Sequence, residues 1–521
     1  MPSRQDTGPG WKSGCGAREL RLRPVVNRNR FLYALVFVVG ISTLGAEIAA
    51  ARLLAPFFGA STMVWANTIG VVLVALSAGY WFGGRFSDRH PEIRYLCLVV
   101  LVAAVLLAVV PFVSQPFFRI SADALDSISA GGFIGSLVAV LFLIAIPVFL
   151  LGTVSPWALR LAITDVEGAG QVAGRLYAIS TAGSLLGTML SALVLIPFAG
   201  TQRTFLAFSL VLTVVAVIGL SRRYVLVPLA LAGVFLIPVG TVKATDEGKI
   251  LYEGETEQQY VQVIERPDGE RILELNEGQA VHSLYRPGTY LTHDYWDGFL
   301  TLPFASLERP PRNIAILGNA AGTIARAYGH FYPQTKVDGV ELDPKLSELG
   351  REYFDMRNPN LTIHDADARP WLRQSDERYD AIFVDAYRQP YIPFYLATKE
   401  FFEEVRDHLR PGGIVIVNIG HPEGNDDLEK AVSATVASVF PNVRRDPAES
   451  TNVLLSASES PLSNDTLLSA ITEIPVQLRN QAVLDGSRLA PALSGGPVYT
   501  DDKAPVEWLI DKSILGYAES Q

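Results

Sequence analysis

The sequence predicts an α-helical membrane domain, a small β-rich leader and an open α/β domain built on a parallel sheet. The chain of 521 residues is 49% hydrophobic and 18% charged, whereas soluble globular proteins average about 25% charged residues. Residues 1–245 hold 18 of the 43 Lys+Arg and 9 of the 53 Asp+Glu, a net charge of +9 against −19 for the rest. Beyond residue 312, strand-like runs alternate with helix-like segments, which indicates a parallel sheet.

Composition also excludes several classes of protein. A mean hydropathy of +0.25 is too high for a disordered chain. The only cysteines, Cys15 and Cys97, exclude a disulfide scaffold and a cysteine-rich metal cluster. The acidic second part has no basic stripe, so nucleic acid is not an expected partner.

Residues 31–245 read as a membrane domain of about seven spans, with the lipid bilayer as partner. Each apolar run has roughly 17 to 25 residues, enough to cross a bilayer. A cleaved signal peptide does not fit the first run, because the run is long and six others follow. The runs are 31–53, 63–84, 95–114, 132–152, 176–198, 204–220 and 224–240.

Loop charges predict the orientation of these spans. The tail of residues 1–30 carries seven basic residues, so the positive-inside bias makes it cytoplasmic and the protein a multi-pass protein of the cell membrane. Alternate loops agree, through Arg85 and Arg89, Arg160 and Arg175, and Arg222. Seven spans then place the second part outside the cell, whereas an even number would place it inside, beside a cytosolic cofactor.

Three features of the membrane half have alternative interpretations. Glu47 and Arg52 lie in or near the first span, where a charge indicates a pathway, a buried pair or an interfacial contact. The segment 79–89, GYWFGGRFSDR, resembles the loop motif of major-facilitator transporters, in which Asp and Arg bond across helix ends. Gly183 and Gly187 form a small-xxx-small pair that favours close helix packing.

The second part divides into a leader, residues 246–305, and an α/β domain, residues 306–521. The leader has strand-like runs separated by the turn signal of Pro267-Asp268-Gly269. The expected strands are 260–264, 271–275, 313–317, 336–341, 361–364, 381–384 and 414–418, and the expected helices include 321–328, 344–354 and 398–409.

The first α/β strand leads into Gly318-Asn319-Ala320-Ala321-Gly322. Small residues at such a turn let a cofactor approach the backbone, although they also occur there merely for packing. Glu341 closes the second strand 23 positions after Gly318, about where an acid grips a ribose hydroxyl. Together they predict a site for an adenosine-type cofactor, with Gly318, Gly322 and Glu341 as binding residues.

Carboxylates follow successive strands. Glu341, Asp367 and Asp385 all fall at carboxyl ends of expected strands, where ligands of open α/β sheets bind. Each acid alone fits a solvated loop or a helix cap, but three at successive strand ends indicate a crevice.

The block from Tyr379 to Asn418, with Leu409-Arg410-Pro411-Gly412-Gly413, resembles the spermidine synthase (polyamine aminopropyltransferase) family. The resemblance covers roughly residues 250–510 and is closest to members fused to membrane spans, whose closing motif is similar to TDDKAPVE at 500–507. It implies a Rossmann-like, methyltransferase-type fold and decarboxylated S-adenosylmethionine or S-adenosylmethionine as co-substrate. It also implies that Glu341 holds the ribose, that Asp367 sits near the adenine and that the protein forms a homodimer.

The same resemblance assigns reactive groups. Asp385 would face the transferred group and is the candidate general base, because a carboxylate can accept the proton of an attacking amine. His293 and Asp294 occupy the place of the family's His-Glu and are further catalytic candidates, with a structural role as the alternative. The sequence contains no cluster of His or Cys residues that would predict a metal site.

The chain departs from the family at two loops. The glycine loop 318–322 lacks the Asp that grips the amine of the decarboxylated donor, and Arg388 lies near the place of a second acid that activates the acceptor. A diamine would be repelled by an arginine in its pocket. Three hypotheses therefore stand: aminopropyl transfer to a small-molecule amine, transfer from S-adenosylmethionine to another acceptor, or a degenerate ligand-sensing domain that regulates a transporter-like membrane half.

Overall fold

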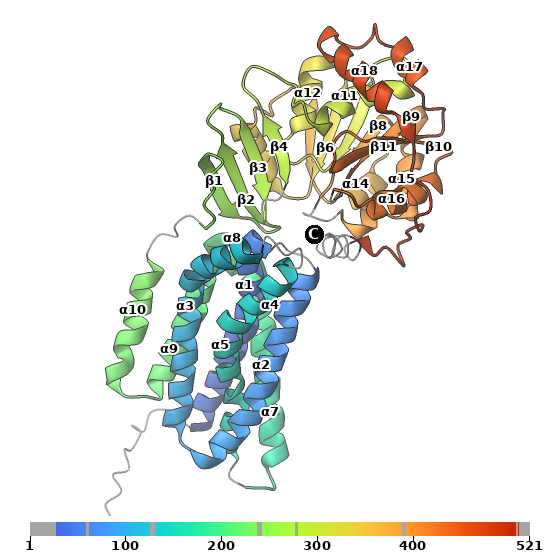
Figure 1. Ribbon diagram of the computed structural model, residues 1–521. Coiled ribbons are helices and arrows are strands. Elements are labelled where there is room, and N and C mark those ends of the chain that lie inside the picture. The colour runs from blue at the N-terminus through green and yellow to red at the C-terminus, as the bar shows by residue number, and fades with distance from the viewer. Residues whose placement is uncertain are drawn as a thin grey trace, which may run out of the picture.

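The computed structural model describes residues 28–58, 62–125, 131–163, 165–236, 242–276, 280–387, 392–421, 423–506 and 509. A bundle of long helices stands beneath an α/β body, with a small separate sheet beside that body (Figure 1). Most of the basic tail and Arg388 lie outside the described residues.

The bundle is built from helices that run back and forth along one another (Figure 1). Its elements are α1 (Arg28–Phe58), α2 (Thr62–Arg89), α3 (Ile93–Leu125), α4 (Gly131–Leu143), α5 (Ala145–Gly152), α6 (Val154–Ala162), α7 (Ala169–Leu190), α8 (Ile196–Ala199), α9 (Thr201–Ile218) and α10 (Leu226–Phe235). A π-helical turn, Ser191–Leu195, joins α7 to α8, and a 3-10 turn, Arg222–Val225, precedes α10.

Prolines account for the interruptions. Pro147 follows the break at Ile144 between α4 and α5, and Pro156 follows the break at Thr153 between α5 and α6. The π-helical turn ends at Leu195, two residues before Pro197. Because proline has no N–H and its ring crowds the carbonyl four residues earlier, the helix is disturbed at that point. Backbone hydrogen bonds nevertheless continue across Ile144 and Thr153, so α4 to α6 form one interrupted helix.

Within the described residues, six helices are long and apolar enough to cross a membrane, one fewer than the seven spans expected. They are Arg28–Phe58, Val64–Arg89, Ile93–Ser114, Ala145–Ala162, Ala169–Ala199 and Thr201–Ile218. The expected seventh run, 224–240, contains α10, whose ten residues span only ~15 Å of a hydrocarbon core ~30 Å thick. Residues 237–240 of that run lie outside the described residues.

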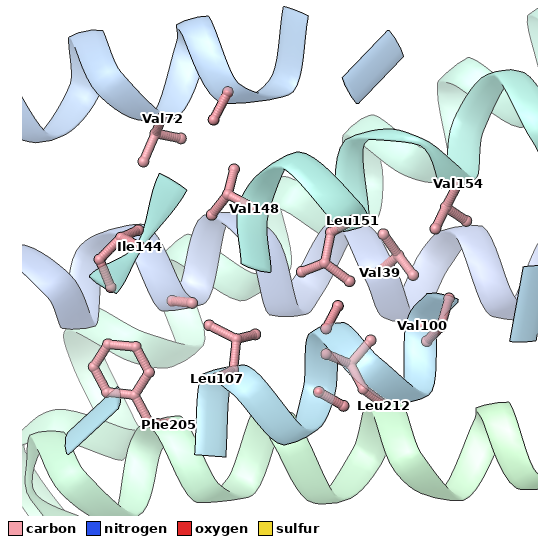
Figure 2. Close-up of a cluster of buried hydrophobic side chains, with 14 of the residues drawn as sticks. Val39, Val72, Val100, Leu107, Ile144, Val148, Leu151, Val154, Phe205 and Leu212 are labelled. Atoms are coloured by element: carbon pink, nitrogen blue, oxygen red, sulfur yellow. The ribbon is translucent and has the colours of Figure 1, made fainter. Parts of the chain in front are cut away.

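Close helix packing forms the core of the bundle. Apolar side chains of α1, α2, α3, α5 and α9 meet there, among them Val39, Leu107 and Phe205 (Figure 2). The predicted contact role of Gly183 and Gly187 is confirmed: a Cβ would lie 2.4 Å from the Phe37 carbonyl oxygen at Gly183 and 2.0 Å from that of Ile41 at Gly187. The backbones of α1 and α7 therefore touch.

The transporter-like segment ends at an ion pair. Asp88, near the end of α2, accepts from the Arg160 guanidinium of α6 at 3.3 Å. Both side chains are more than half exposed, so the pair adds little stability and mainly marks where two helix ends meet.

The second part contains two sheets. The leader forms an antiparallel sheet of β1 (Lys249–Glu255), β2 (Tyr260–Glu265), β3 (Arg271–Leu275) and β4 (Val281–Tyr285), paired in chain order. The large sheet has the order β12-β10-β11-β9-β8-β5-β6-β7. Its strands are β5 (Asn313–Leu317), β6 (Lys336–Glu341), β7 (Leu361–Asp365), β8 (Tyr379–Val384), β9 (Leu409–Gly420), β10 (Asn442–Asp446), β11 (Asn452–Ser458) and β12 (Ala490–Pro491).

The large sheet is buried on both faces. Ile314 and Ile316 of β5 pack among α12 and its neighbours, while Ala315 and Leu317 pack on the opposite side with α15 and α16. The covering helices are α11 (Gly298–Thr301), α12 (Thr323–Phe331), α13 (Pro344–Tyr353), α14 (Ala368–Gln374), α15 (Lys399–Asp407), α16 (Asp427–Ala437), α17 (Asn464–Ser469) and α18 (Arg479–Arg488). This arrangement is the predicted Rossmann-like α/β fold. Its central strands are mostly apolar because helices cover both faces of the sheet.

Strand order fixes where a ligand can bind. The strands β5 to β9 run parallel, and the order reverses at β5, which lies between β6 and β8. In open α/β sheets the crevice lies at the carboxyl ends of the strands at such a switch point. Gly318 follows β5 and Asp385 follows β8, so both stand at this point.

The end of the chain is tied to the α/β body by a buried arginine. The Arg369 guanidinium donates to both carboxylate oxygens of Asp501, at 2.7 and 2.8 Å, and also to Glu404. Asp501 accepts a further hydrogen bond from the Thr398 hydroxyl at 2.7 Å. The closing motif therefore braces α14 and α15, which flank the crevice.

We expect a Gly187→Leu substitution to destabilise the bundle by more than ~2 kcal/mol, because it forces a side chain into the α1 backbone. Gly174→Leu is the matched control on the same helix, since its Cβ would meet nothing within 4 Å. Thermal unfolding of the purified full-length variants in detergent compares them. An unchanged melting temperature for the Gly187 variant would contradict the packing described.

An Asp501→Asn substitution should lower the free energy of unfolding of the α/β part by ~1 kcal/mol, because a buried guanidinium loses a charged partner while Glu404 remains. Asp502→Asn is the control, since Asp502 is a neighbouring exposed carboxylate and Arg369 donates to Asp501 instead. Denaturant unfolding of the full chain, followed by fluorescence, measures both. Equal losses in the two variants would argue against a bracing role for Asp501.

Candidate active site

A cavity of about 970 Å³ opens at the carboxyl ends of β5, β6, β8 and β9. The leader, the α/β body and one residue of the bundle, Trp65, contribute to its lining. Ligand cavities of small molecules measure roughly 300–1,000 Å³. The cavity therefore has room for a nucleoside and a second small substrate.

The backbone geometry of the loop after β5 requires glycine at two positions. Gly318 has a φ of 93°, and a Cβ there would lie 2.5 Å from the carbonyl oxygen of Asp385. Gly322 has a φ of 88°, and its Cβ would lie 2.1 Å from the Met356 sulfur. Both positions thus require glycine. Of the two predicted cofactor residues, Gly318 lines the cavity, whereas Gly322 lies outside the lining and begins α12.

Glu341 is held at the cavity wall by two backbone amides. Its Oε2 accepts from Ala320 N at 2.7 Å and its Oε1 from Asp343 N at 2.9 Å. Burial raises the pKa of Glu341 to about 7. Each carboxylate oxygen retains a second lone pair, so the group fits the hydroxyls of a ribose.

Asp367 lies at the start of α14 and lines the same cavity. Its Oδ1 caps the helix by accepting from Arg369 N at 3.2 Å, and its Oδ2 accepts from the Tyr395 hydroxyl at 3.0 Å. Arg369, which binds Asp501, also donates to the Tyr395 carbonyl at 3.0 Å. The Asp367 side chain therefore caps a helix, which is the ordinary role expected for such an acid, and it also lines the cavity.

Asp385 follows β8 and contacts polar side chains of β9 and of the 3-10 turn Tyr295–Asp297. Its Oδ1 accepts from Asn418 Nδ2 at 2.8 Å, and the Tyr295 hydroxyl lies 3.3 Å from its Oδ2. Asn452 Nδ2 in turn donates to Asn418 Oδ1 at 3.0 Å. Burial raises the pKa of Asp385 to about 7, although these hydrogen bonds lower it. A carboxylate with such a pKa can exchange a proton near neutral pH.

A second group of carboxylates lines the cavity on the leader side. Asp294 makes no hydrogen bond through its carboxylate among the described residues, and burial together with the nearby Glu449 raises its pKa to about 6. Glu449 accepts from Tyr295 N at 2.8 Å. His293 is not brought into the cavity: its side chain is exposed, its φ is 60°, and its backbone N donates to Asp297 at 2.8 Å.

The cavity is strongly acidic. Its described lining contains seven carboxylates and two guanidinium groups, a formal net charge of −5. The carboxylates are those of Glu270, Asp294, Glu341, Asp343, Asp367, Asp385 and Glu449. Both arginines, Arg266 and Arg286, are paired with Glu270. The uncompensated charge favours a cationic ligand.

Several lining residues were missed at the level of sequence. Asn418 closes an expected strand, so the same rule that singled out the strand-end acids applied to it. Trp65, Tyr295 and Glu449 carry no such signal, because only the fold brings them to the cavity. Among the described residues, no group of three or more His, Cys, Asp and Glu side chains is arranged to hold a metal ion.

Comparisons with known proteins find one matching family and several relatives. Residues 300–448 match the family described as Spermine/spermidine synthase domain. A probable polyamine aminopropyl transferase of Bifidobacterium longum is 34% identical over 283 residues, which cover 50% of this chain and 63% of that protein. A polyamine aminopropyltransferase of Vibrio vulnificus is 30% identical over 198 residues, 37% of this chain and 62% of that protein. The chain thus covers less than two thirds of each relative.

Solved structures show weaker likeness. A probable spermidine synthase from Corynebacterium glutamicum is 23% identical with a TM-score of 0.37, covering 50% of this chain and all of that one. The spermidine synthase from Thermotoga maritima is 18% identical with a TM-score of 0.35, covering 52% and 88%. The similarity to the spermine/spermidine synthase family therefore rests on the sequence matches and on the strand order of the large sheet. Residues 300–448 thus match the spermine/spermidine synthase domain family, and the chain is similar in sequence to proteins named polyamine aminopropyltransferases.

Proposed function

We propose that the protein transfers an aminopropyl group from decarboxylated S-adenosylmethionine to a small-molecule amine. The observation that carries this proposal is the acidic cavity at the strand ends of a spermine/spermidine synthase domain. Both substrates are cationic, and seven carboxylates against two paired arginines favour cations of either kind.

The residues present fit the nucleoside part of the donor. Glu341 offers carboxylate lone pairs to a ribose, and Asp367 stands after the third parallel strand, on the side where an adenine would lie. The donor supplies a sulfonium, whose positive charge makes the adjacent carbon open to attack. The protein's own contribution is to hold the acceptor in line with that carbon and to keep water out.

The lining also favours the decarboxylated donor over S-adenosylmethionine itself. A carboxylate on the donor would need a free cation, yet Arg286 binds Glu270 at 2.5 Å and Arg266 binds Glu270 and Glu247. The glycine loop offers no acid for the donor's amine, but Asp294 and Glu449 supply other carboxylates to the cavity lining. This distribution disfavours the second hypothesis, transfer from S-adenosylmethionine to another acceptor.

Asp385 is the residue we assign as general base. The acceptor nitrogen forms the new C–N bond while the C–S bond breaks and its electron pair stays on sulfur, giving a thioether. The proton displaced from the nitrogen passes to the Asp385 carboxylate. Asn418 and the Tyr295 hydroxyl hold that carboxylate in place, and its raised pKa lets it accept the proton near pH 7.

We further propose that the bundle spans the cell membrane as a multi-pass domain with its N-terminal end cytoplasmic. Nine arginines lie at the helix ends that face away from the α/β body (Figure 1): Arg28, Arg30, Arg85, Arg89, Arg94, Arg160, Arg175, Arg222 and Arg223. Only Arg52, Arg119 and Arg203 lie toward the opposite end among the described residues. The positive-inside bias favours a cytoplasmic location for the arginine-rich end.

This orientation places the catalytic part on the non-cytoplasmic face. The connection is made by α10, which is too short to count as a span by itself yet leads from the arginine-rich end of α9 toward β1 (Figure 1). Both substrates then have to reach that face of the membrane.

An Asp385→Asn variant should lose at least 100-fold in kcat, because general-base catalysis contributes about 10²–10⁴, while binding of methylthioadenosine, the thioether product, is retained. In the wild type, kcat should rise with pH up to about 7 and level off above it, because the carboxylate is the active form. Asp376→Asn, at an exposed position, is the matched control.

Product analysis with both donors and a panel of amines measures turnover, and calorimetry measures binding. Full activity in Asp385→Asn would remove the proposed base. A wild-type protein that binds the nucleoside but transfers nothing to any amine would support the ligand-sensing hypothesis instead.

For the topology, an alkaline phosphatase reporter fused to the C-terminus should be active, because the enzyme folds only outside the cytoplasm. The same reporter inserted at the turn between α2 and α3, beside Arg89 and Arg94, should be inactive and serves as the control. A fluorescent cytoplasmic reporter that works at the C-terminus would contradict the proposed orientation.

A further inference from the structure

One wall of the cavity is supplied by the membrane half. Trp65 lies in the first turn of α2 and lines the cavity together with residues of the leader and the α/β body. Its side chain is half-buried. Tryptophan near a helix end is commonly a membrane-interface anchor, but an anchor faces headgroups, whereas this ring faces the substrate cavity.

Two contacts hold the helix ends against the loop between β1 and β2. The Arg52 guanidinium, near the end of α1, donates to the backbone carbonyl of Glu257. The Thr201 hydroxyl, at the start of α9, donates to Glu255 Oε2 at 2.6 Å. Burial raises the pKa of Glu255. The loop continues into Gln258 and Gln259, both of which line the cavity beside the membrane half.

The same loop reaches the nucleoside end of the cavity. Thr256 Oγ1 donates to Asp343 Oδ2 at 2.5 Å, and Asp343 N donates to Glu341 Oε1 at 2.9 Å. A continuous set of contacts therefore leads from the ends of α1 and α9 to the carboxylate that fits a ribose. The loop that the bundle holds is therefore also bound to the part of the cavity wall that contains Glu341.

We propose that Trp65 is a binding residue for the nucleoside part of the donor, so that the membrane half completes the donor site. This inference rests on the proposed function for the identity of the donor. A flat indole ring in a cavity wall suits a purine, because aromatic rings stack favourably on one another and bury a large apolar area. The membrane half is then a part of the enzyme's binding machinery and not only a tether.

The test uses the full-length protein in detergent or nanodiscs, with methylthioadenosine as the probe. Trp65→Leu keeps an apolar side chain but removes the ring, and it should weaken methylthioadenosine binding and raise the KM for the donor by about tenfold. Trp65→Phe keeps a ring and should restore most of the affinity. The kcat and the KM for the amine should change less than twofold in both variants.

Trp81→Leu is the matched control, because Trp81 lies on the same helix, is 65% exposed and has Arg85 over its ring at the end away from the cavity. Equal affinities in Trp65→Leu, Trp81→Leu and the wild type would overturn the proposal. If the wild type transfers no aminopropyl group but methylthioadenosine binding still depends on Trp65, the proposed reaction fails while the donor-site assignment stands. Normal transfer with no dependence on Trp65 removes only the assignment.

Discussion

The approach of the end of β5 to the end of β8 is the constraint on which the site depends. Asp385 N donates to the Leu317 carbonyl at 2.9 Å, and Gly318 has no side chain, which leaves room for the Asp385 carbonyl. The loop after β5 also donates its Ala320 amide to Glu341 at 2.7 Å. The same approach sets Asp385 against Asn418. Glu341 and Asp385, the proposed ribose-binding carboxylate and the proposed base, thus line one cavity.

Burial of these acids has a cost that a cationic substrate can offset. The folded-state pKa values of Glu341 and Asp385 both rise from the ordinary range to about 7, chiefly through burial. A raised carboxyl pKa means that their contribution to stability is fully present below pH ~4 and is lost as the pH rises toward 7. At neutral pH the site therefore holds partly ionised, poorly solvated carboxylates. A bound cation stabilises these buried carboxylates, so ligand binding and protein stability are linked in this cavity.

The sequence predicted the sheet well because its strands are buried on both faces. The runs 313–317 and 336–341 coincide with β5 and β6, and the helix expected at 344–354 is α13 at Pro344–Tyr353. Apolar runs of strand length between turn signals carry that information locally. The positions of Asp385, Asp367 and Glu341 could be predicted from the sequence for the same reason, since each stands at the end of such a run. Glu449 and Trp65 were not, because their place at the cavity depends on how distant segments pack. His293 was assigned because His293-Asp294 occupies the place of the family's His-Glu, but its backbone is left-handed and the residue does not line the cavity.

The contact between the two halves gives the helical bundle a thermodynamic role. Arg52 and Thr201 hold residues 255–257, and Thr256 in turn holds Asp343 beside Glu341. Any rearrangement that separates the ends of α1 and α9 must break these hydrogen bonds or carry the loop with it. If the nucleoside prefers the joined arrangement, its binding favours that arrangement of the helices by the same free energy with which the helices favour its binding. Under the proposed function, the loop between β1 and β2 therefore couples the helical bundle to the donor site.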